Sequence, residues 1–252
     1  MTKVISLFNQ VGGAAKSTST HNIGYHLAQR DRKVLLVDLD PQGTLTLFCG
    51  HQPENLIETV ADIVLSEEIS KNVPIIKGDN FDLLPSNISL SAAEMMLITA
   101  DMRDLRLKDA LSPILDDYDF ILIDCLPSLG ILSYIALVAS SYVLVPIECE
   151  YKAFAGTNLL MQTIKRVRGR ANRKLKIAGF IPTKYDARRS QHKRTLESIH
   201  QRFDTVSGVL PPIPASTDFA DASEKGMCLY EYKPKHKAIA VLDEIAEYLL
   251  TL

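Results

Sequence analysis

The segment NQVGGAAKST, residues 9–18, places two glycines, a lysine and a serine at a spacing that suits phosphate binding. An apolar run over 3–9 leads into it and a helical pattern over 16–30 follows, as in a phosphate-binding loop. In such a loop, successive backbone N–H groups surround phosphate oxygens and the start of the helix adds positive potential. We expect Lys16 to reach the β- and γ-phosphates and the Ser17 hydroxyl to ligate Mg²⁺. The predicted nucleotide contacts in this loop are Gly12, Gly13, Ala14, Ala15, Lys16, Ser17 and Thr18.

Two positions depart from the usual pattern of a phosphate-binding loop. Ala15 stands directly before Lys16, where glycine is usual, and Val11 precedes the glycine pair. A residue with a side chain avoids positive φ, so we predict that Ala15 keeps a negative φ and that the loop follows an altered path. The alternative interpretation is an ordinary glycine-containing turn between a strand and a helix.

Aspartates end two further apolar runs. Asp38 and Asp40 close the run LLVDLD, and Asp124 closes the run FILID. A carboxylate removed from water is costly unless it is paired or faces a metal ion. We therefore predict Asp38 and Asp124, together with Ser17, as metal ligands. For each run alone, the alternative is that its aspartates only form a turn or cap a helix. The phosphate-binding loop and the two runs ending in aspartate, however, are three signals at three strand ends, and they support one another.

Strands alternate with helical patterns along the chain. The expected strands are 3–9, 33–40, 81–86, 119–125, 142–148, 176–183 and 207–214, and the expected helices are near 16–30, 90–117, 129–139, 153–169, 190–203 and 235–251. Such alternation predicts an α/β fold with a single doubly wound, mostly parallel sheet and helices on both faces. No repeat or Pro/Gly linker divides the sequence, so we expect one domain over 1–252.

Ligands of such sheets bind at the carboxyl ends of the strands. The loop 10–17 and the aspartates all fall at such ends. Thr183 and Pro214, the last residues of the segments 176–183 and 207–214, are also assigned to nucleotide binding.

One long stretch without charge needs a separate interpretation. The 23 residues from 125 to 147 could in length cross a bilayer. Pro127, Gly130 and Pro146 interrupt them, however, and buried parallel strands are also continuously apolar. We predict a buried helix followed by a buried strand.

Composition sets the remaining limits. A chain of 252 residues with 46% hydrophobic residues can bury a full core, and its net charge of −2 indicates no charged partner. Its four cysteines are far apart, which argues against zinc and disulfides and favours a reducing, cytoplasmic location. The first apparent strand begins at Lys3, so no signal peptide is expected.

Nearly the whole chain resembles ParA-type partition ATPases, members of the ParA/MinD family with a deviant Walker A motif. The resemblance rests on five segments: FNQVGGAAKSTSTHNIGYHLA, KVLLVDLDPQG, FDLLPSNISLSAAEM, YDFILIDCLPSLGILSYIALVASSYVLVPIECEY and IPTKYDARRSQHKRTLESI. It implies a P-loop NTPase fold, ATP and Mg²⁺ as cofactors, and an ATP-sandwich homodimer. It also implies non-specific binding to nucleoid DNA, with release when a small adaptor protein stimulates hydrolysis.

The resemblance also assigns residue roles. Asp40 matches the residue that orients the attacking water, Asp124 the Walker B carboxylate and Asn22 an asparagine behind the loop. Lys16, Asp40 and Asp124 are therefore the expected catalytic residues. Without an arginine finger in cis, basal turnover is expected to be slow.

Val11 occupies the position of the family's signature lysine, which reaches across the dimer to the partner's phosphates. Its loss resembles the carboxysome-positioning branch known as McdA, which we prefer over plasmid or chromosome partition. A closed dimer still needs a cation facing the shared phosphates. Lys152, after the segment 142–148, is the preferred replacement and is counted among the nucleotide contacts, and Lys184 is the second candidate.

Positive charge gathers in one part of the chain. Residues 152–202 hold 14 Lys and Arg but only two acidic residues. No recognition motif accompanies them, so the pattern predicts sequence-independent contact with the DNA backbone. The predicted DNA-binding residues are Arg168, Arg170, Arg173, Lys174, Arg188, Arg189, Lys193 and Arg194.

Three other classes compete with this interpretation. A membrane-cycling, MinD-like ATPase would need a basic amphipathic C-terminal helix, but VLDEIAEYLLTL is acidic, so no membrane contact is expected. A reductase similar to the nitrogenase iron protein would need paired cluster cysteines, and Cys125 and Cys149 are not placed for that role. A metabolic amide or carboxylate ligase of the same fold stays open.

Overall fold

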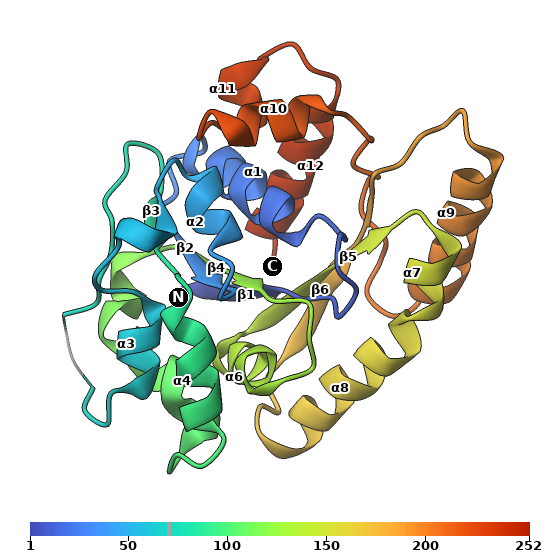
Figure 1. The fold of residues 1–252 in the computed structure, drawn as a ribbon. Coiled ribbons are helices and arrows are strands. Elements are labelled where there is room, and N and C mark those ends of the chain that lie inside the picture. Colours follow the sequence, from blue (N-terminus) through green and yellow to red (C-terminus); the bar gives the residue numbers. More distant parts are fainter. Residues whose placement is uncertain (70–71) are drawn as a thin grey trace.

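The computed structural model describes residues 1–69 and 72–252 (Figure 1). Within them, six strands form one sheet in the order β3–β2–β4–β1–β5–β6, and every neighbouring pair is parallel. The strands are β1 (Lys3–Leu7), β2 (Val34–Leu39), β3 (Asp82–Leu84), β4 (Phe120–Cys125), β5 (Tyr142–Glu148) and β6 (Lys176–Thr183).

Helices cover both faces of this sheet (Figure 1). One face carries α1 (Lys16–Ala28), α2 (Thr44–Phe48), α10 (Asp218–Glu224), α11 (Leu229–Tyr232) and α12 (Ala238–Leu250). The other carries α3 (Val60–Leu65), α4 (Ser89–Leu97), α5 (Arg106–Leu111), α6 (Ile131–Ala139), α7 (Tyr151–Ala155), α8 (Thr157–Arg170) and α9 (Ser190–Phe203). The predicted doubly wound parallel α/β fold is confirmed.

Strand alternation divides the core into two layers. In β1, Ile5 and Leu7 pack with α1 and α12, whereas Val4 and the adjoining Phe8 belong to the cluster on the opposite face. Successive side chains of a strand point to opposite faces, so a strand covered on both sides must be apolar at every position. This is why the central strands form continuous apolar runs in the sequence.

The uncharged stretch 125–147 forms the end of β4, the helix α6 and most of β5, as predicted. In the described part of the chain, no helix is long and apolar enough to cross a membrane.

Two expected helices are broken in the structure. The expected helix at 90–117 contains α4, a 3₁₀ turn at Arg103–Leu105 (η2), α5 and a second 3₁₀ turn at Ser112–Asp117 (η3). Pro113 lies in the first turn of η3, where its ring cannot donate a helical hydrogen bond. The expected helix at 153–169 divides at Gly156 into α7 and α8. The short helices α2, α3, α10 and α11 and the turn Pro53–Asn55 (η1) lie outside the expected helices.

The expected strand at 207–214 is wrong. This segment runs beside β6 and makes only isolated bridges, Phe180 to Val209 and Tyr185 to Pro214. Prolines have no N–H group to donate to a ladder, and two of them, Pro211 and Pro212, interrupt the pairing between these bridges.

Because all six strands are parallel, their carboxyl ends meet at one edge of the sheet. The loop after β1, the aspartates ending β2 and β4, and the residues after β5 and β6 therefore lie near one another. The candidate site lies along this edge.

Candidate functional site

The phosphate-binding loop is fixed by the ends of two neighbouring strands. Buried Asn9 donates from Nδ2 to the Pro146 carbonyl at 2.6 Å, and its Oδ1 accepts the Val11 N–H at 3.0 Å. On the other side, the Thr183 hydroxyl donates to the Ala14 carbonyl at 3.1 Å. The loop is thus tied to β5 and β6 by hydrogen bonds within the protein. Thr183, which sequence reasoning placed at the nucleotide, supports the phosphate-binding loop through this hydrogen bond.

The backbone of the loop contradicts the prediction for Ala15. Ala15 has φ 62° and ψ 34°, in the left-handed region, and Gly13 has φ 79°. The prediction was wrong because Ala15 is the residue at which the chain enters α1, with its carbonyl accepting the Ser19 N–H at 2.9 Å. This conformation costs an L-residue about 1–2 kcal/mol. The loop therefore keeps a glycine-like geometry although it lacks the glycine.

Lys16 begins α1 and is only 7% exposed. Its Nζ donates to the Val11 carbonyl at 3.4 Å, so the side chain folds back over the loop. Burial lowers the pKa of Lys16, while the charge of Asp124 acts in the opposite direction. The helix has no side-chain cap, so the N–H groups of its first turn are available to an anion.

Asp38 and Asp124 lie side by side, because their Cα positions pair across β2 and β4. Both are buried. Asp38 Oδ2 accepts the backbone N–H and the hydroxyl of Thr46, each at 2.8 Å, and Oδ1 accepts the Asp40 N–H at 3.1 Å. Burial raises the pKa of Asp38 to about 6 in spite of these hydrogen bonds.

Asp124 has no such partners. Neither of its carboxylate oxygens has a hydrogen-bond partner among the described residues. Burial first, and then the charge of Asp38, raise the pKa of Asp124 well above its ordinary value, while Ser17 and Lys16 act against this rise. A buried carboxylate without partners is costly, so this site is incomplete without a cation or a water that donates to it.

These side chains fit a magnesium ion held together with phosphate groups. No cluster of three or more His, Cys, Asp or Glu side chains among residues 1–69 and 72–252 could hold a metal alone. Mg²⁺ at phosphate sites usually takes only one or two carboxylates and completes its shell with phosphate oxygens and water. Asp124 and the Ser17 hydroxyl are available for this role, whereas Asp38 is largely satisfied by Thr46.

Asp40 is half-buried at the end of β2. Its Oδ1 accepts the Gln42 N–H at 2.9 Å, which leaves the second oxygen to contact water. Burial, and then the charge of Asp40, raise the pKa of Glu94 on α4. Sequence reasoning missed Glu94, Asn9 and Thr46. The one sequence signal that could have identified these three residues is that each is polar and stands among apolar neighbours.

Asn22 donates to the Thr18 carbonyl and accepts the Leu229 N–H, and thus joins α1 to α11.

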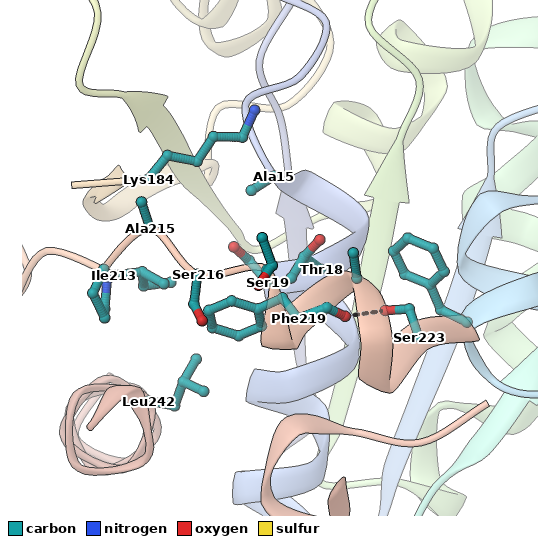
Figure 2. A pocket seen from close by; sticks show the side chains of 14 residues that line it. Ala15, Thr18, Ser19, Lys184, Ile213, Ala215, Ser216, Phe219, Ser223 and Leu242 are labelled. Carbon is teal, nitrogen blue, oxygen red and sulfur yellow. Dashed lines mark hydrogen bonds between the residues drawn. The ribbon is translucent and has the colours of Figure 1, made fainter. Parts of the chain in front are cut away.

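A cavity of about 520 Å³ opens beside the start of α1 (Figure 2). Pro214, which the sequence predicted as a nucleotide contact, lines this cavity. The other lining residues are Ala15, Thr18, Ser19, Phe48, Lys184, Ile213, Ala215, Ser216, Thr217, Phe219, Ala220, Ser223 and Leu242. Its wall is largely apolar with a few hydroxyls, which suits a flat base better than a phosphate chain. Sequence reasoning missed most of the 213–223 wall because no motif marks it.

The two lysines considered for the missing signature position differ in their surroundings. Lys152 is exposed on α7. The Gly156 N–H donates to the Lys152 carbonyl at 3.3 Å, and a Cβ on Gly156 would lie 3.2 Å from Val11 Cγ2. Lys152 is therefore one helical turn from the residue that packs against the loop. Lys184 lines the cavity, and its Nζ lies 3.1 Å from Glu148 Oε1.

The predicted DNA-binding side chains are all exposed, but the structure divides them into two groups. Arg168, Arg170, Arg173 and Lys174 lie at the end of α8 and before the start of β6. Arg188, Arg189, Lys193 and Arg194 follow the far end of β6 and continue into α9. With about 3.3 Å per residue of strand, eight-residue β6 keeps the groups about 26 Å apart.

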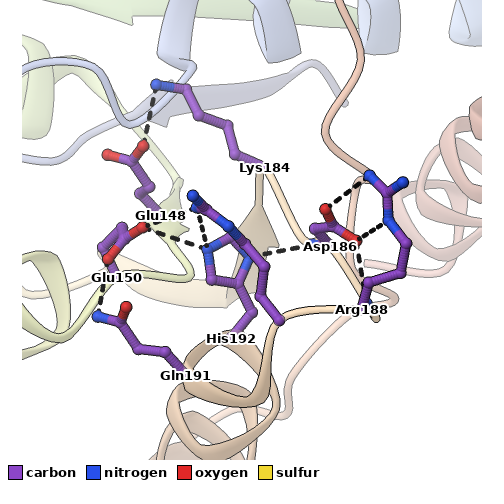
Figure 3. Close-up of polar contacts among 8 residues, drawn as sticks. Glu148, Glu150, Lys184, Asp186, Arg188, Gln191 and His192 are labelled. Carbon is purple, nitrogen blue, oxygen red and sulfur yellow. Dashed lines mark hydrogen bonds and ion pairs between the residues drawn. The ribbon is translucent and has the colours of Figure 1, made fainter.

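The second group already contacts acidic side chains (Figure 3). Arg188 binds Asp186 through two nitrogens at 2.9 and 3.0 Å, and Arg189 lies 3.3 Å from Glu150. Buried His192 accepts the Asp186 N–H at Nδ1, and its Nε2 lies 3.2 Å from Glu150 and 3.1 Å from Arg189. These contacts hold the start of α9 against the loop after β5.

Comparisons with known proteins agree with this geometry. A family model described as an AAA domain matches residues 2–177. The chain is 36% identical over 251 residues to the sporulation initiation inhibitor protein Soj of Bacillus subtilis, with 98% of both chains covered.

Solved structures add two further likenesses. A Mycobacterium smegmatis protein named cobyrinic acid a,c-diamide synthase, with a bound ATP analogue and magnesium, has a TM-score of 0.87 and 36% identity, covering 99% of this chain and 95% of that one. Apo McdA of Cyanothece has a TM-score of 0.89, covering 99% of this chain and 100% of that one, but at 23% identity it supports the fold alone. The cofactors expected here, ATP and Mg²⁺, agree with the ligands of the M. smegmatis protein.

Proposed function

Because the chain belongs to the ParA/MinD-type family of P-loop ATPases, we propose that it hydrolyses ATP to ADP and phosphate as a partition or positioning ATPase. The observation that carries this proposal is the pairing of the loop at 12–18 with the unpartnered, buried Asp124. A phosphate-bound Mg²⁺ would satisfy this carboxylate. Among the described residues, Ser17 and Lys16 favour its charged form only in part, and neither of its oxygens has a close hydrogen-bond partner.

The residues of this chain divide the work of hydrolysis. The loop N–H groups and Lys16 bind and orient the phosphates, and the apolar cavity beside α1 accepts the base. Ser17 and Asp124 would hold Mg²⁺, which neutralises charge that develops on the transferred phosphoryl group. Asp40, with one oxygen left to contact water, would orient the attacking water. Turnover by these groups alone is expected to be slow.

The proposed active form is a homodimer that closes over two ATP molecules. Val11 offers no charge to a partner's phosphates, so another cation must face them. Lys152 is the preferred residue because it is exposed and one turn from Gly156, which packs against Val11.

Closure of the dimer would create a binding surface for DNA. The basic groups at the two ends of β6 supply the charge, and their separation suits an extended contact with phosphate backbone rather than a reading of bases. A small adaptor would stimulate hydrolysis and release the DNA, so the protein would be nucleoid-associated in the cytoplasm.

Two cargoes fit this cycle. The uncharged Val11 supports a McdA-like role in carboxysome positioning, and a McdB-like adaptor would then be the partner. Identity of 36% with Soj over nearly the full length supports partition of a chromosome or plasmid with a ParB-like partner. Likeness to McdA at 23% identity adds support for the fold but none for the cargo, so we favour partition.

The dimer is tested by light scattering with ATP, with ADP and without nucleotide. We expect a dimer only with ATP, and DNA binding only by that dimer. Lys152→Ala should keep ATP binding yet lose dimerisation and DNA binding, and Lys184→Ala is the matched comparison. Normal ATP-dependent dimerisation of Lys152→Ala would refute the role given to Lys152. An ATP-bound parent that stays monomeric would refute the dimer itself.

The name of the M. smegmatis neighbour favours a second candidate, ATP-dependent amide formation. Amide synthases that use glutamine need a reactive thiolate. Burial raises the pKa of Cys125 and Cys149 to about 12, and it also raises the pKa of Cys49 and Cys228. All four cysteines are therefore poor nucleophiles, and ammonia would have to come from solution. ATP turnover that requires ammonia and a carboxylic acid, and ignores DNA, would establish this candidate instead.

A further inference from the structure

Lys184 has an unusual backbone for a residue with a long side chain. It is one of four non-glycine residues with positive φ in the described chain, at φ 52°. Left-handed residues of this kind cost energy and persist where the surrounding structure holds them. They are concentrated at functional sites.

Hydrogen bonds on both sides of Lys184 hold this conformation. Before it, the Thr183 carbonyl accepts the Cys149 N–H at 3.0 Å. After it, the Tyr185 N–H donates to the Ile213 carbonyl at 3.0 Å, and the Tyr185 carbonyl accepts the Ala215 N–H at 2.9 Å. The chain thus turns sharply between β6 and the cavity wall, and the turn directs the Lys184 side chain over the phosphate-binding loop (Figure 2).

The ammonium group of Lys184 lies at the loop itself. A Cβ added to Gly13 would lie 3.6 Å from Lys184 Nζ and 3.9 Å from Glu148 Oε2. Lys184 Nζ also lies 3.1 Å from Glu148 Oε1, and both side chains are partly exposed. A cation and its carboxylate partner therefore stand beside the glycine where a phosphate chain would lie.

Glu148 is the more firmly held member of this pair. It ends β5, and two residues later Glu150 accepts hydrogen bonds from Gln191 at 2.8 Å and from Arg189 at 3.3 Å (Figure 3). The Glu148 backbone carbonyl also accepts the Glu150 N–H at 2.7 Å. The Lys184 stem has four rotatable methylene links and no second described partner for its Nζ, so the lysine is the side chain that can move.

We propose that Lys184 is a phosphate ligand of its own chain's nucleotide site, and that Glu148 holds its ammonium group while no phosphate is present. This inference rests on the proposed ATP binding. It differs from the trans-acting role considered for Lys152, because Lys184 faces the loop of the chain to which it belongs. When a nucleotide enters, the ammonium group of Lys184 leaves the partly exposed Glu148 carboxylate for a phosphate oxygen, and no covalent bond changes.

The exchange has a clear physical reason. An ion pair between partly exposed side chains stabilises a protein little, whereas a phosphate held among buried groups forms stronger, charge-assisted hydrogen bonds. Glu148 without its lysine would repel the phosphates, since it stands close to the same glycine. Lys184 therefore both adds attraction and cancels a repulsion.

The first test measures the binding of ADP, ATP and adenosine, with Mg²⁺, by calorimetry. Light scattering should first show that the ADP-bound protein is a monomer. We expect Lys184→Met to weaken ADP and ATP by about 10-fold or more, the usual effect of losing a charge-assisted hydrogen bond. Adenosine should bind unchanged, because it has no phosphate. Lys184→Arg should recover most of the ADP affinity.

Glu148→Gln provides a readout that a merely structural lysine would not give. Removal of the competing carboxylate should strengthen ADP binding by about two- to fivefold, the range of a partly exposed ion pair. In the Lys184→Met background, the same change should give a clearly different effect. If Glu148→Gln strengthens ADP equally with and without Lys184, simple repulsion explains it and the holding role is wrong.

Folding is controlled with Lys184→Gly, because glycine tolerates positive φ. This variant should melt at the same temperature as the parent or higher, yet bind ADP as weakly as Lys184→Met. If Lys184→Met and Lys184→Gly bind ADP and ATP like the parent, the phosphate-ligand role is overturned while the proposed ATPase stands. If the parent itself binds neither nucleotide, the proposed function fails and this inference with it.

Discussion

Asp38 should make the nucleotide-free protein less stable as pH rises. Its side chain is fully buried beside Asp124, and burial raises its pKa from 3.8 to about 6. Between these two values the folded protein binds more protons than the unfolded chain, so the free energy of unfolding falls as pH increases. At 1.36 kcal/mol per pKa unit, the loss between pH 4 and pH 7 amounts to about 2 kcal/mol, because the unfolded carboxyl is already partly ionised at pH 4.

Asp38→Asn removes this titration and should be compared with the parent across the pH range. Relative to the parent, the variant should gain about 2 kcal/mol in unfolding free energy from pH 4 to pH 7. Its absolute stability at pH 4 should be lower, because an amide whose oxygen accepts the two Thr46 hydrogen bonds places its nitrogen where Asp38 Oδ1 accepts the Asp40 N–H. The informative quantity is therefore the pH dependence of the difference.

The assay is urea unfolding at several pH values, without nucleotide or Mg²⁺. Thr46→Val is the matched control, since it removes a donor to Asp38 and leaves the charge in place. The pKa of Asp38 should then rise further, and the decline in stability with pH should become steeper. A difference between Asp38→Asn and the parent that stays constant from pH 4 to pH 7 would show that Asp38 is not held in a proton-binding state.

Four other changes test the site. Ala15→Gly should relieve the left-handed strain at φ 62° and raise the melting temperature by about 1–3 °C, after the entropy of glycine is counted; a lower melting temperature would contradict the strain. Lys16→Ala should weaken ATP by about 10- to 100-fold in calorimetry, and unchanged affinity would refute the loop assignment. Asp40→Ala should bind ATP but slow phosphate release by about 100-fold or more, and turnover at the parental rate would remove Asp40 as the water-orienting group. Arg188→Glu with Arg189→Glu should weaken all DNA sequences alike in gel-shift titrations, with a log–log salt slope in the parent of about −0.9 per phosphate contacted; strong preference for one sequence would argue against the proposed role.

The sequence by itself determined the architecture and the chemistry of the loop. Apolar runs of strand length alternate with helical patterns, and this alternation is a local signal because burial on both faces requires an apolar residue at each position. The same runs end in Asp38 and Asp124, and the spacing of Gly12, Gly13 and Lys16 defines the phosphate loop. The parallel direction and the register of the strands place the loop and the two aspartates at the same edge of the sheet.

Tertiary structure alone decided how the groups are paired. Asp38 and Asp124 are 86 positions apart, and only the register of β2 against β4 makes them neighbours, with Thr46 satisfying one and leaving the other without a partner. The basic residues close in sequence were separated by the length of β6.

Backbone conformation at the two strained positions was also beyond the sequence. Ala15 and Lys184 adopt positive φ against their intrinsic preference, because hydrogen bonds from distant strands and loops fix the chain on both sides of each. The segment 207–214, in contrast, did not become a full strand for a local reason: its prolines interrupt a ladder that the neighbouring β6 otherwise offers. The intrinsic preference of each residue sets the energetic cost of its backbone conformation. Contacts with residues distant in sequence determine whether the folded chain adopts that conformation.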